Sequence, residues 1–341
     1  MNISSGKLLG LRRLADKTGI FKIVAVDQRP PIQNIIKSIL GVDEAPWEDV
    51  SKVKRVLAES LAEESSAILM DPLFAWPIAN SVLRNDQGLM LTLEHAEYEE
   101  TPRGRLSKII PEWNVSKIKR AGADGVKLLA WYRPDSGKEV LEHQKNFVKQ
   151  IGDECVRYDI PFLLELLVYP FPDESLEFLK LNKSMLVQES VSEFADPKYS
   201  VDLFKLENPV NDSDLLSEDG LNTESIQKVF DELGQISGRP WVMLSAGASA
   251  DNFRKILQYA FRAGASGFLA GRAIWWESFV NNFPEIDQIR KSLELDGVKY
   301  MREINDLSTQ HANPWTSHPL YDSSIQMQYS TRDFAKLYGE F

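Results

Sequence analysis

The sequence is poor in the residue types that build disulfides and zinc sites. Its 341 residues include one cysteine, Cys155, and four histidines that are scattered along the chain. A single cysteine cannot form an internal disulfide, and it excludes any multi-cysteine metal site. A zinc site would need several ligands that converge. We therefore expect no metal and no other cofactor, and a reducing, cytoplasmic setting.

Long apolar runs and an excess of basic residues are also missing. No run of about 18 apolar residues occurs, so no segment is expected to span a membrane, and the N-terminal segment lacks the apolar core of a signal peptide. Lys and Arg total 39 against 50 Asp and Glu, a formal net charge of −11. This balance argues against nucleic-acid and anionic-membrane partners, which attract clustered cations. An acidic protein can still carry a local basic pocket for an anionic small molecule.

What the chain does contain is a series of eight short apolar runs, most of them separated by amphipathic, helix-like stretches. Near-continuous apolar runs are typical of strands that are buried on both faces. Eight such βα units predict an α/β fold, a (β/α)8 or TIM barrel of parallel strands. A doubly wound open sheet is the alternative, although it normally uses fewer strands. The runs are 21–27, 67–71, 88–94, 125–132, 161–170, 202–207, 241–247 and 267–272.

The chain shows neither a Gly/Ser-rich linker nor a shift in composition, so we predict a single domain over residues 1–341. The barrel is expected over roughly 20–285, followed by a C-terminal helical tail over roughly 286–341. The clearest helix precedes the eighth run, because its apolar side chains recur on one face. These are Phe253, Ile256, Leu257, Ala260 and Phe261.

Three charged residues interrupt otherwise apolar strands. Lys127, Glu165 and Lys205 lie on the fourth, fifth and sixth runs, which neighbour one another in a barrel. A charge inside a barrel is costly unless it is paired or used. Two lysines beside a carboxylate favour imine chemistry, because burial and a second ammonium both favour the neutral, nucleophilic form of a lysine. A purely structural ion pair is the alternative interpretation, but it would not need a second lysine.

Small residues end the seventh and eighth runs, in LSAGAS and FLAGR. Such residues let backbone N–H groups approach an anion, and the N-terminus of a following helix adds positive potential. Barrels of this type often hold a phosphate at these two strands. Alternatively, the glycines only form tight turns. The predicted phosphate-binding residues are Ser245, Ala246, Gly247, Gly271 and Arg272.

The first run ends in Asp27, Gln28 and Arg29. Active sites of barrels lie at the carboxyl ends of the strands, so these side chains are expected at the site. Asp27 can orient a substrate hydroxyl or pair with Lys127 or Lys205. A capping role at the junction of strand and loop is the alternative for Asp27.

Six segments, in order, resemble the strand motifs of the class I tagatose-1,6-bisphosphate aldolases, a family with a related branch that acts on sulfofructose 1-phosphate. They are AVDQR, GADGVKLL, DIPFLLELLVY, VDLFKLENPVN, LSAGAS and AGRAIWWES, and the later INDLSTQHANPW resembles the C-terminus of the tagatose branch. The resemblance implies a metal-free, reversible aldol cleavage that gives dihydroxyacetone phosphate and an aldehyde.

The resemblance also implies roles for individual residues. Lys205, in LFKLENPVN, matches the Schiff-base lysine, and Glu165 and Lys127 match the glutamate and lysine of strands five and four. Asp27 and Gln28 match the Asp-Gln of strand one. The phosphate loops match Ser245 to Gly247 and Gly271-Arg272.

One position departs from the tagatose pattern. Arg133, in WYRPD, stands where tagatose-type sequences tend to carry an acidic residue, and the sulfosugar branch has an arginine in a similar segment. We therefore expect Arg133 to contact an anion at the far end of the substrate.

The substrate is then a ketohexose 1,6-bisphosphate such as tagatose 1,6-bisphosphate, cleaved to dihydroxyacetone phosphate and glyceraldehyde 3-phosphate. Sulfofructose 1-phosphate, cleaved to dihydroxyacetone phosphate and sulfolactaldehyde, is an alternative. Another Schiff-base barrel enzyme, such as a transaldolase or a deoxyribose-phosphate-type aldolase, and a non-catalytic sugar-phosphate sensor are further alternatives. A homo-oligomer is expected.

Overall fold

Eight parallel strands close into a barrel in the computed structural model, which describes residues 2–216, 223–321 and 325–339. Pairing of β11 with β2 closes the sheet, so the (β/α)8 prediction is confirmed and the open-sheet alternative is wrong. Each predicted run contains one strand. In their order around the barrel they are β2 (Phe21–Ala25), β3 (Ala67–Met70), β4 (Gly88–Thr92), β7 (Gly125–Trp131), β8 (Phe162–Leu167), β9 (Leu203–Leu206), β10 (Trp241–Met243) and β11 (Gly267–Ala270).

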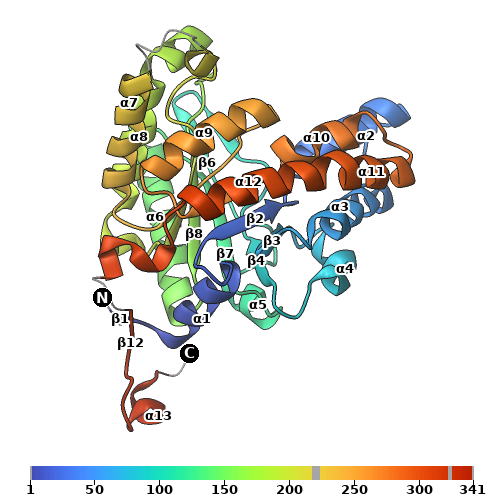
Figure 1. The fold of residues 1–341 in the computed structure, drawn as a ribbon. Helices are drawn as coiled ribbons and strands as arrows, with labels where there is room; N and C mark the ends of the chain where they lie inside the picture. Colours follow the sequence, from blue (N-terminus) through green and yellow to red (C-terminus); the bar gives the residue numbers. More distant parts are fainter. Residues whose placement is uncertain (1, 217–222, 322–324, 340–341) are drawn as a thin grey trace.

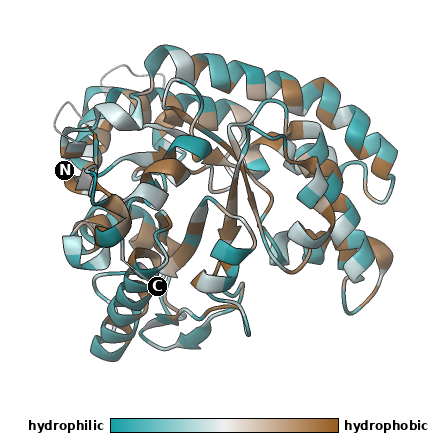
Figure 2. Ribbon diagram, turned by 90° about the horizontal axis from the view of Figure 1, so that it is seen from below, coloured by the Kyte–Doolittle hydropathy of each residue, from teal (hydrophilic) through white to brown (hydrophobic). Residues whose placement is uncertain are grey.

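Helices surround the strands, so each strand is covered outside as well as inside (Figure 1). Figure 2 shows the consequence, since the hydrophobic colour gathers on the central strands while the helices carry hydrophilic residues outward. The helices between the barrel strands are α2 (Pro30–Leu40), α3 (Trp47–Leu61), α4 (Trp76–Ala79), α5 (Val115–Arg120), α6 (Lys138–Arg157), α7 (Leu176–Phe194), α8 (Thr223–Ser237) and α9 (Ala250–Arg262), and α10 (Arg272–Val280) follows β11.

The interior of the barrel is built in layers. Because successive side chains of a strand point to opposite faces, Leu163 and Glu165 point the same way, as do Leu203 and Lys205. Leu163 and Leu203 belong to an apolar cluster that is distinct from the cluster between strands and helices. This apolar layer fills the barrel beneath the charged layer. The charged side chains are therefore directed toward the carboxyl end of the strands.

The predicted C-terminal helical tail is present. It begins with α11 (Ile286–Ser292), passes through a π-helical turn, η5 (Leu293–Gly297), and continues as α12 (Val298–His311), which crosses the face of the barrel in Figure 1. Ion pairs fix it to the barrel helices: Arg290 to Glu59 at 2.7 Å and Arg302 to Glu64 at 2.8 Å. Segments 217–222 of the predicted barrel, and 322–324 and 340–341 of the predicted tail, lie outside the described residues.

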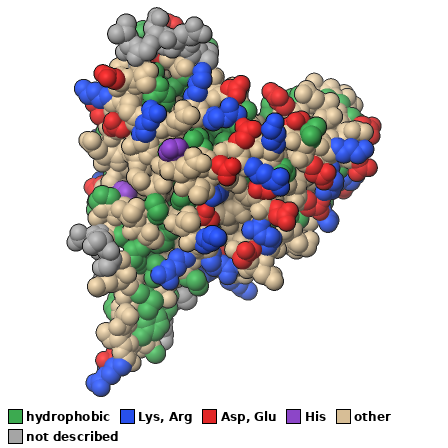
Figure 3. All heavy atoms as spheres, viewed as in Figure 1, with side chains coloured by type: hydrophobic (Ala, Val, Ile, Leu, Met, Phe, Trp, Pro, Cys, Tyr) green, Lys and Arg blue, Asp and Glu red, His purple; other side chains and the backbone are tan. Residues whose placement is uncertain are grey.

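The two ends of the chain meet at the base of the barrel. β1 (Asn2–Ile3) pairs with β12 (Gln326–Met327), and α1 (Ser5–Leu14) follows β1. Asp159 ties the two ends together, because its carboxylate accepts hydrogen bonds from the hydroxyls of Ser4 and Tyr338 and from the backbone N–H of Gly6, the last at 2.6 Å. α13 (Phe334–Leu337) lies in the lower projection of Figure 3, where hydrophobic side chains reach the surface.

Acidic and basic side chains are intermixed over most of the face shown in Figure 3. Among the helices that the structure describes, none is long and apolar enough to cross a membrane.

The ion pair between Lys54 and Asp71 is buried between α3 and the barrel. Lys54 donates to Asp71 Oδ2 at 2.5 Å and to the backbone carbonyl of Val26 at 2.7 Å, and both charged side chains are fully buried. Asp71 Oδ1 also accepts from the backbone N–H groups of Leu73 and Phe74. Burial lowers the pKa of Lys54, and Asp71 opposes this effect. The pair thus links α3, β3 and the residue before Asp27.

We predict that Lys54→Met lowers the free energy of unfolding by about 3–5 kcal/mol, because it leaves the buried Asp71 carboxylate uncompensated. Urea denaturation measures the loss. Lys52→Met, at an exposed position of the same helix, is the control and should stay close to wild type. Adding Asp71→Asn to Lys54→Met should recover much of the stability, since asparagine keeps the two backbone hydrogen bonds. A Lys54→Met protein as stable as wild type would contradict this account.

Candidate active site

Glu165 bridges the two buried lysines. Its Oε2 atom lies 2.8 Å from Lys127 Nζ and 2.9 Å from Lys205 Nζ. The strand register explains the contact, because Glu165 on β8 is paired directly with Lys205 on β9, while Leu129 on β7 faces Glu165 from the other side. The three charged residues predicted from the interrupted strands therefore form one cluster inside the mouth of the barrel.

Lys127 has two further carboxylate partners. Its Nζ atom lies 3.0 Å from Asp27 Oδ2 and 2.6 Å from Glu94 Oε1, in addition to Glu165. Burial alone would lower the pKa of Lys127, but the attraction of the three carboxylates outweighs it and raises that pKa well above its ordinary value. In the described part of the chain Lys205 pairs with Glu165 alone. The two lysines are thus not equivalent.

The pKa values of the carboxylates Asp27 and Glu165 are lowered, whereas that of Lys127 is raised. Burial would raise the pKa of Asp27, yet Lys127 and Lys205 lower it well below its usual range. The same two ammonium groups lower the pKa of Glu165 against the effect of burial. Both carboxylates are therefore ionised at neutral pH, and Lys127 carries its charge permanently.

Glu94 was not among the residues predicted for the site. Besides the contact with Lys127, its Oε2 accepts from Leu129 N at 3.1 Å, and Arg29 donates to its backbone carbonyl at 2.9 Å. Glu94 ends the third apolar run, and that run neighbours the one that carries Lys127. The sequence therefore contained a signal for it, a carboxylate at a strand end beside a buried lysine.

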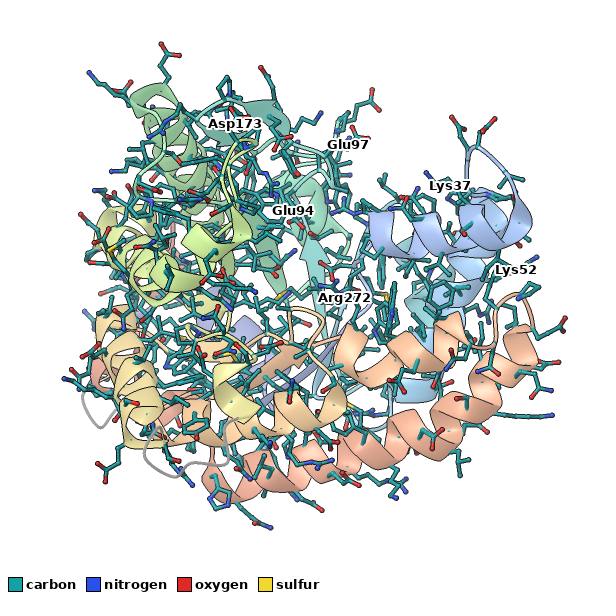
Figure 4. The ribbon with its side chains drawn as sticks, turned by 90° about the horizontal axis from the view of Figure 1, so that it is seen from above. Lys37, Lys52, Glu94, Glu97, Asp173 and Arg272 are labelled. Carbon is teal, nitrogen blue, oxygen red and sulfur yellow. The ribbon has the colours of Figure 1, made fainter. Side chains whose placement is uncertain are left out.

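A cavity of about 550 Å³ opens above the cluster, at the carboxyl ends of the strands. Figure 4 looks onto the barrel from above, and Glu94 and Arg272 both lie near the mouth in that view. Its lining combines charged groups with aromatic and aliphatic side chains. The lining includes Asp27, Gln28, Arg29, Glu94, Tyr98, Lys127, Leu129, Trp131, Glu165, Leu167, Lys205 and Arg272.

Three polar atoms of the first strand end are buried without a partner among the described residues. Asp27 Oδ1, Gln28 Oε1 and Arg29 Nε form no hydrogen bond with any residue that the structure describes. Buried polar atoms are costly unless they are satisfied, so a substrate that reaches them gains binding energy. Gly271 packs against this segment: a Cβ at position 271 would lie 2.5 Å from the carbonyl oxygen of Ala25 and 3.0 Å from Gln28 Nε2. Only glycine fits there.

The predicted phosphate loops lie side by side. Ala246 and Gly247 both have positive φ, 48° and 88°, which turns the backbone sharply after Ser245. A Cβ at Gly247 would lie 3.4 Å from Arg272 Nη1, so the loop after β10 meets the start of α10. Arg272 has neither a hydrogen bond nor an ion pair within residues 2–216, 223–321 and 325–339. Its guanidinium also borders a neighbouring cavity together with Gly247 and Ser249.

The structure does not bring Arg133 to the cavity. Its side chain has no exposed surface, its guanidinium forms ion pairs with Asp135 and Glu174, and Nη1 also donates to the carbonyl of Tyr169 at 2.7 Å. Burial alone would lower the pKa of Arg133, but Glu174 and Asp135 outweigh burial and raise this pKa. An arginine with its donors engaged in this way has none to offer a substrate. Arg133 is therefore not placed to make the contact with the far end of the substrate that we expected from the sequence.

Metal-ligating side chains do not gather into a group of three or more anywhere in the described ranges.

Glu207, which follows β9, is a buried carboxyl beside this site. Its Oε1 accepts from Val168 N at 2.7 Å, and its pKa is raised to about 7, mainly by burial, with Lys183 acting against the shift and Glu165 adding to it. Between the ordinary pKa of 4.5 and about 7 the unfolded chain loses this proton while the folded chain keeps it. The contribution to stability therefore falls as the pH rises through that window.

We predict that Glu207→Gln removes this pH dependence. The variant keeps the acceptor for Val168 N, and relative to wild type it should gain about 3 kcal/mol of unfolding free energy between pH 4.5 and pH 8. Urea denaturation at several pH values gives the difference. Glu189→Gln, which removes an exposed carboxylate from α7, is the control for charge alone. A difference that does not change with pH would show that folding does not shift the pKa of Glu207.

The family model for the DeoC/LacD family aldolases matches residues 21–277. A tagatose 1,6-diphosphate aldolase of Listeria monocytogenes is 33% identical over 325 residues, covering 92% of this chain and 95% of that protein. Tagatose 1,6-diphosphate aldolase 2 of Enterococcus faecalis is 32% identical over 328 residues, covering 92% and 97%.

Solved structures agree on the fold. An archaeal fructose 1,6-bisphosphate aldolase matches with a TM-score of 0.60 at 16% identity, over 89% of this chain and 99% of that chain. Fructose-bisphosphate aldolase from Plasmodium falciparum matches with a TM-score of 0.64 at 13% identity, over 92% and 98%. At such identities the likeness concerns the barrel alone. The family model and the relatives from Listeria and Enterococcus go further, and by them the chain belongs to the DeoC/LacD aldolase family.

Proposed function

We propose that the protein is a class I aldolase that reversibly cleaves a ketohexose 1,6-bisphosphate, such as tagatose 1,6-bisphosphate, into dihydroxyacetone phosphate and glyceraldehyde 3-phosphate. One observation carries the proposal: Glu165 bridges two buried lysines, of which Lys127 has three carboxylate partners and Lys205 has only Glu165 among the described residues. The relatives named tagatose 1,6-diphosphate aldolase support the choice of substrate.

In this mechanism Lys205 is the nucleophile. Its neutral Nζ adds to C2 of the open-chain ketose, and the carbonyl oxygen takes up a proton to give a carbinolamine. Loss of water then leaves an iminium between Nζ and C2. Glu165, 2.9 Å from Nζ, is placed to take the proton that the amine loses and to return it to the departing hydroxyl.

Cleavage follows from the electron demand of the iminium. A base removes the proton of the C4 hydroxyl, the C3–C4 bond breaks, and its electron pair moves into the C2–C3 bond to give an enamine while the aldehyde leaves. Protonation at C3 and hydrolysis release dihydroxyacetone phosphate and restore Lys205. We assign these proton transfers to Glu165, and we assign the orientation of a substrate hydroxyl to Asp27, whose Oδ1 is free to accept.

Lys127 has an electrostatic role. Its permanent charge lies beside Glu165 and Asp27, so it keeps both carboxylates ionised, and as a donor it can contact a substrate oxygen. Gln28 and Arg29 line the same cavity and are assigned to substrate hydroxyls.

The C1 phosphate is assigned to the loops after β10 and β11, with Ser245, Ala246, Gly247, Gly271 and Arg272 as its ligands. Arg272 supplies a guanidinium without a partner among the described residues, and the backbone turn at Ala246 and Gly247 lies beside it. β9 is the neighbour of β10 in the barrel. Only C1 and one oxygen separate C2 from the phosphorus, so a phosphate held there brings C2 to Lys205.

The alternative substrate, sulfofructose 1-phosphate, was inferred from Arg133, whose contacts keep it outside the cavity. We therefore favour the bisphosphate.

We predict that borohydride reduction in the presence of dihydroxyacetone phosphate adds a stable mass to the peptide that contains Lys205. Lys205→Met should lose the adduct and nearly all turnover, because the nucleophile is gone. Peptide mass mapping and a coupled assay for dihydroxyacetone phosphate release provide the two measurements.

Lys127→Met is the matched variant, since it removes the other buried ammonium. It should still form the adduct, but more slowly, because Glu165 and Asp27 lose the charge that keeps them ionised. Circular dichroism verifies that the variant folds. A trapped mass on Lys127 would reverse the two roles, and an active enzyme without any adduct would refute the imine mechanism.

We also predict that turnover survives excess EDTA with less than a twofold change, because the iminium is the electron sink of the proposed mechanism. The assay compares EDTA-treated protein with the same protein after addition of Zn²⁺. Full loss of activity that zinc restores would refute the metal-free mechanism.

A further inference from the structure

The hairpin between β4 and β7 carries an arginine in an aromatic cage. The hairpin consists of β5 (Glu99–Thr101) and β6 (Gly104–Leu106), and Arg105 lies on β6. The guanidinium carbon of Arg105 is 4.2 Å from the ring centroid of Tyr98, 4.4 Å from that of Tyr169 and 4.7 Å from that of Trp131. Tyr169 also fixes the backbone, because its hydroxyl accepts from Arg105 N at 2.9 Å. Three rings thus orient one cation.

The guanidinium of Arg105 has an ion-pair partner, Glu100, but no hydrogen bond to any residue that the structure describes. Arg105 Nε is buried without a hydrogen-bond partner, and no hydrogen bond joins its side chain to the residues that the structure describes. Glu100, whose side chain is half exposed, approaches Nε only to 3.5 Å. The Arg105 side chain is 13% exposed. The aromatic faces compensate the charge in part, but the N–H groups are left for another acceptor.

Arg133 provides the contrast. It also lies near an aromatic ring, with its guanidinium carbon 4.0 Å from the centroid of Phe171, yet Asp135, Glu174 and a carbonyl take its donors. Arg133 is thus a structural arginine that joins segments of the chain. Arg105 has the geometry of a binding residue, since it is held rigidly by its neighbours and keeps its donors available.

The cage forms part of the cavity wall above the lysines. Tyr98 and Trp131 both line the cavity that contains Lys127 and Lys205. Their rings also pack edge to face, with centroids 5.4 Å apart, so the wall is continuous at this point. Arg105 stacks on both rings, so its guanidinium lies directly beside two residues of the cavity wall.

The order of the strands places the cage opposite the C1 phosphate site. In the closed order β10-β11-β2-β3-β4-β7-β8-β9, the pair β4 and β7 is directly across the barrel from β10 and β11. Tyr98 and Arg105 follow β4, and Trp131 ends β7. Figure 4 shows Glu94, which follows β4, and Arg272, which begins α10, separated across the mouth. A ketose anchored at Arg272 and at Lys205 therefore extends its far carbons toward the cage.

We propose that Arg105 is a specificity-determining residue that binds the tetrahedral oxyanion at the far end of the substrate, a terminal phosphate or sulfonate. The assignment rests on the proposed function. Arg29 also lines the cavity and has a buried Nε without a described partner, but its Nη1 and Nη2 both face Glu94. Its strand, β2, is next to β11, on the side of the proposed C1 phosphate site. A planar guanidinium can bind two oxygens of such an anion at once.

The test compares substrates that differ only at the far end. We expect Arg105→Gln to raise KM for the ketohexose 1,6-bisphosphate by 10-fold to 100-fold, the effect of losing a charge-assisted hydrogen bond. For the ketohexose 1-phosphate, which has a neutral end, KM and kcat should change by less than twofold. Arg105→Lys should give an intermediate KM for the bisphosphate, because it keeps the charge and loses the planar pair of donors.

The 6-deoxy-6-sulfo analogue distinguishes the two sources of the oxyanion. If the wild type prefers it over the bisphosphate and Arg105→Gln abolishes that preference, the site is selective for sulfonate. If the wild type prefers the bisphosphate and Arg105→Gln abolishes that preference, the site is selective for phosphate. Both results support the role of Arg105 in binding an anion.

Arg103→Gln is the matched control, because Arg103 is exposed on the same hairpin and stacks on Phe171, which does not line the cavity, whereas Arg105 stacks on two rings that do. It should leave both KM values unchanged. An equal rise of KM for bisphosphate and 1-phosphate in Arg105→Gln, or an unchanged KM for both, would overturn the proposal.

Borohydride trapping with dihydroxyacetone phosphate distinguishes a wrong assignment of Arg105 from a wrong proposed function. That ligand has no far anion, so Arg105→Gln should form the Lys205 adduct as well as wild type does. Lack of an adduct in the wild type would refute the aldolase itself. A normal adduct with unaltered substrate preference would refute only the role of Arg105.

Discussion

The ammonium group of Lys127 is the interaction on which the active site depends. It joins four strands, because its partners Asp27, Glu94 and Glu165 come from the ends of β2 and β4 and from the interior of β8. A buried charge network is stable only when its members are satisfied together. Removing the cation would leave three carboxylates facing one another in a closed space. Lys205 lies at the edge of the network with one carboxylate partner among the described residues, and we assign the nucleophilic role to it for this reason.

The barrel supports this network by its periodicity. Leu163 and Leu203 fill the interior one step below Glu165 and Lys205, and each charged residue is two positions further along its strand. The apolar layer excludes water from below, which strengthens the electrostatic interactions above it. Below Asp27, the contacts of Lys54 with the Val26 carbonyl and with Asp71 hold the end of β2 in place. Positions of the charged atoms are therefore determined by close packing on every side except the cavity.

The fold and the centre of the site could be predicted from the sequence because both follow from strand periodicity. A charged residue in a buried, apolar strand is costly unless its side chain finds partners inside the barrel. This rule identified Lys127, Glu165 and Lys205. Loop residues follow no such rule. Arg105 and Arg133 both lie in connections after barrel strands, but Arg133 meets Glu174, which is 41 positions away in the chain, and Arg105 meets rings from three segments. Only the tertiary structure distinguishes the structural arginine from the one with free donors.

β7 connects the chemical centre to the proposed recognition site. Its inward positions follow the strand period, so that Lys127, Leu129 and Trp131 line the cavity one above another. Lys127 belongs to the charged cluster, and Trp131 forms one wall of the Arg105 cage. A rigid strand thus fixes the separation between the ammonium and the far anion site. Since the loops to which we assign the C1 phosphate lie across the barrel, our assignments imply that a substrate of the wrong length could not occupy both proposed anion sites and still present C2 to Lys205. By this proposal the rigid barrel itself selects the length of the substrate.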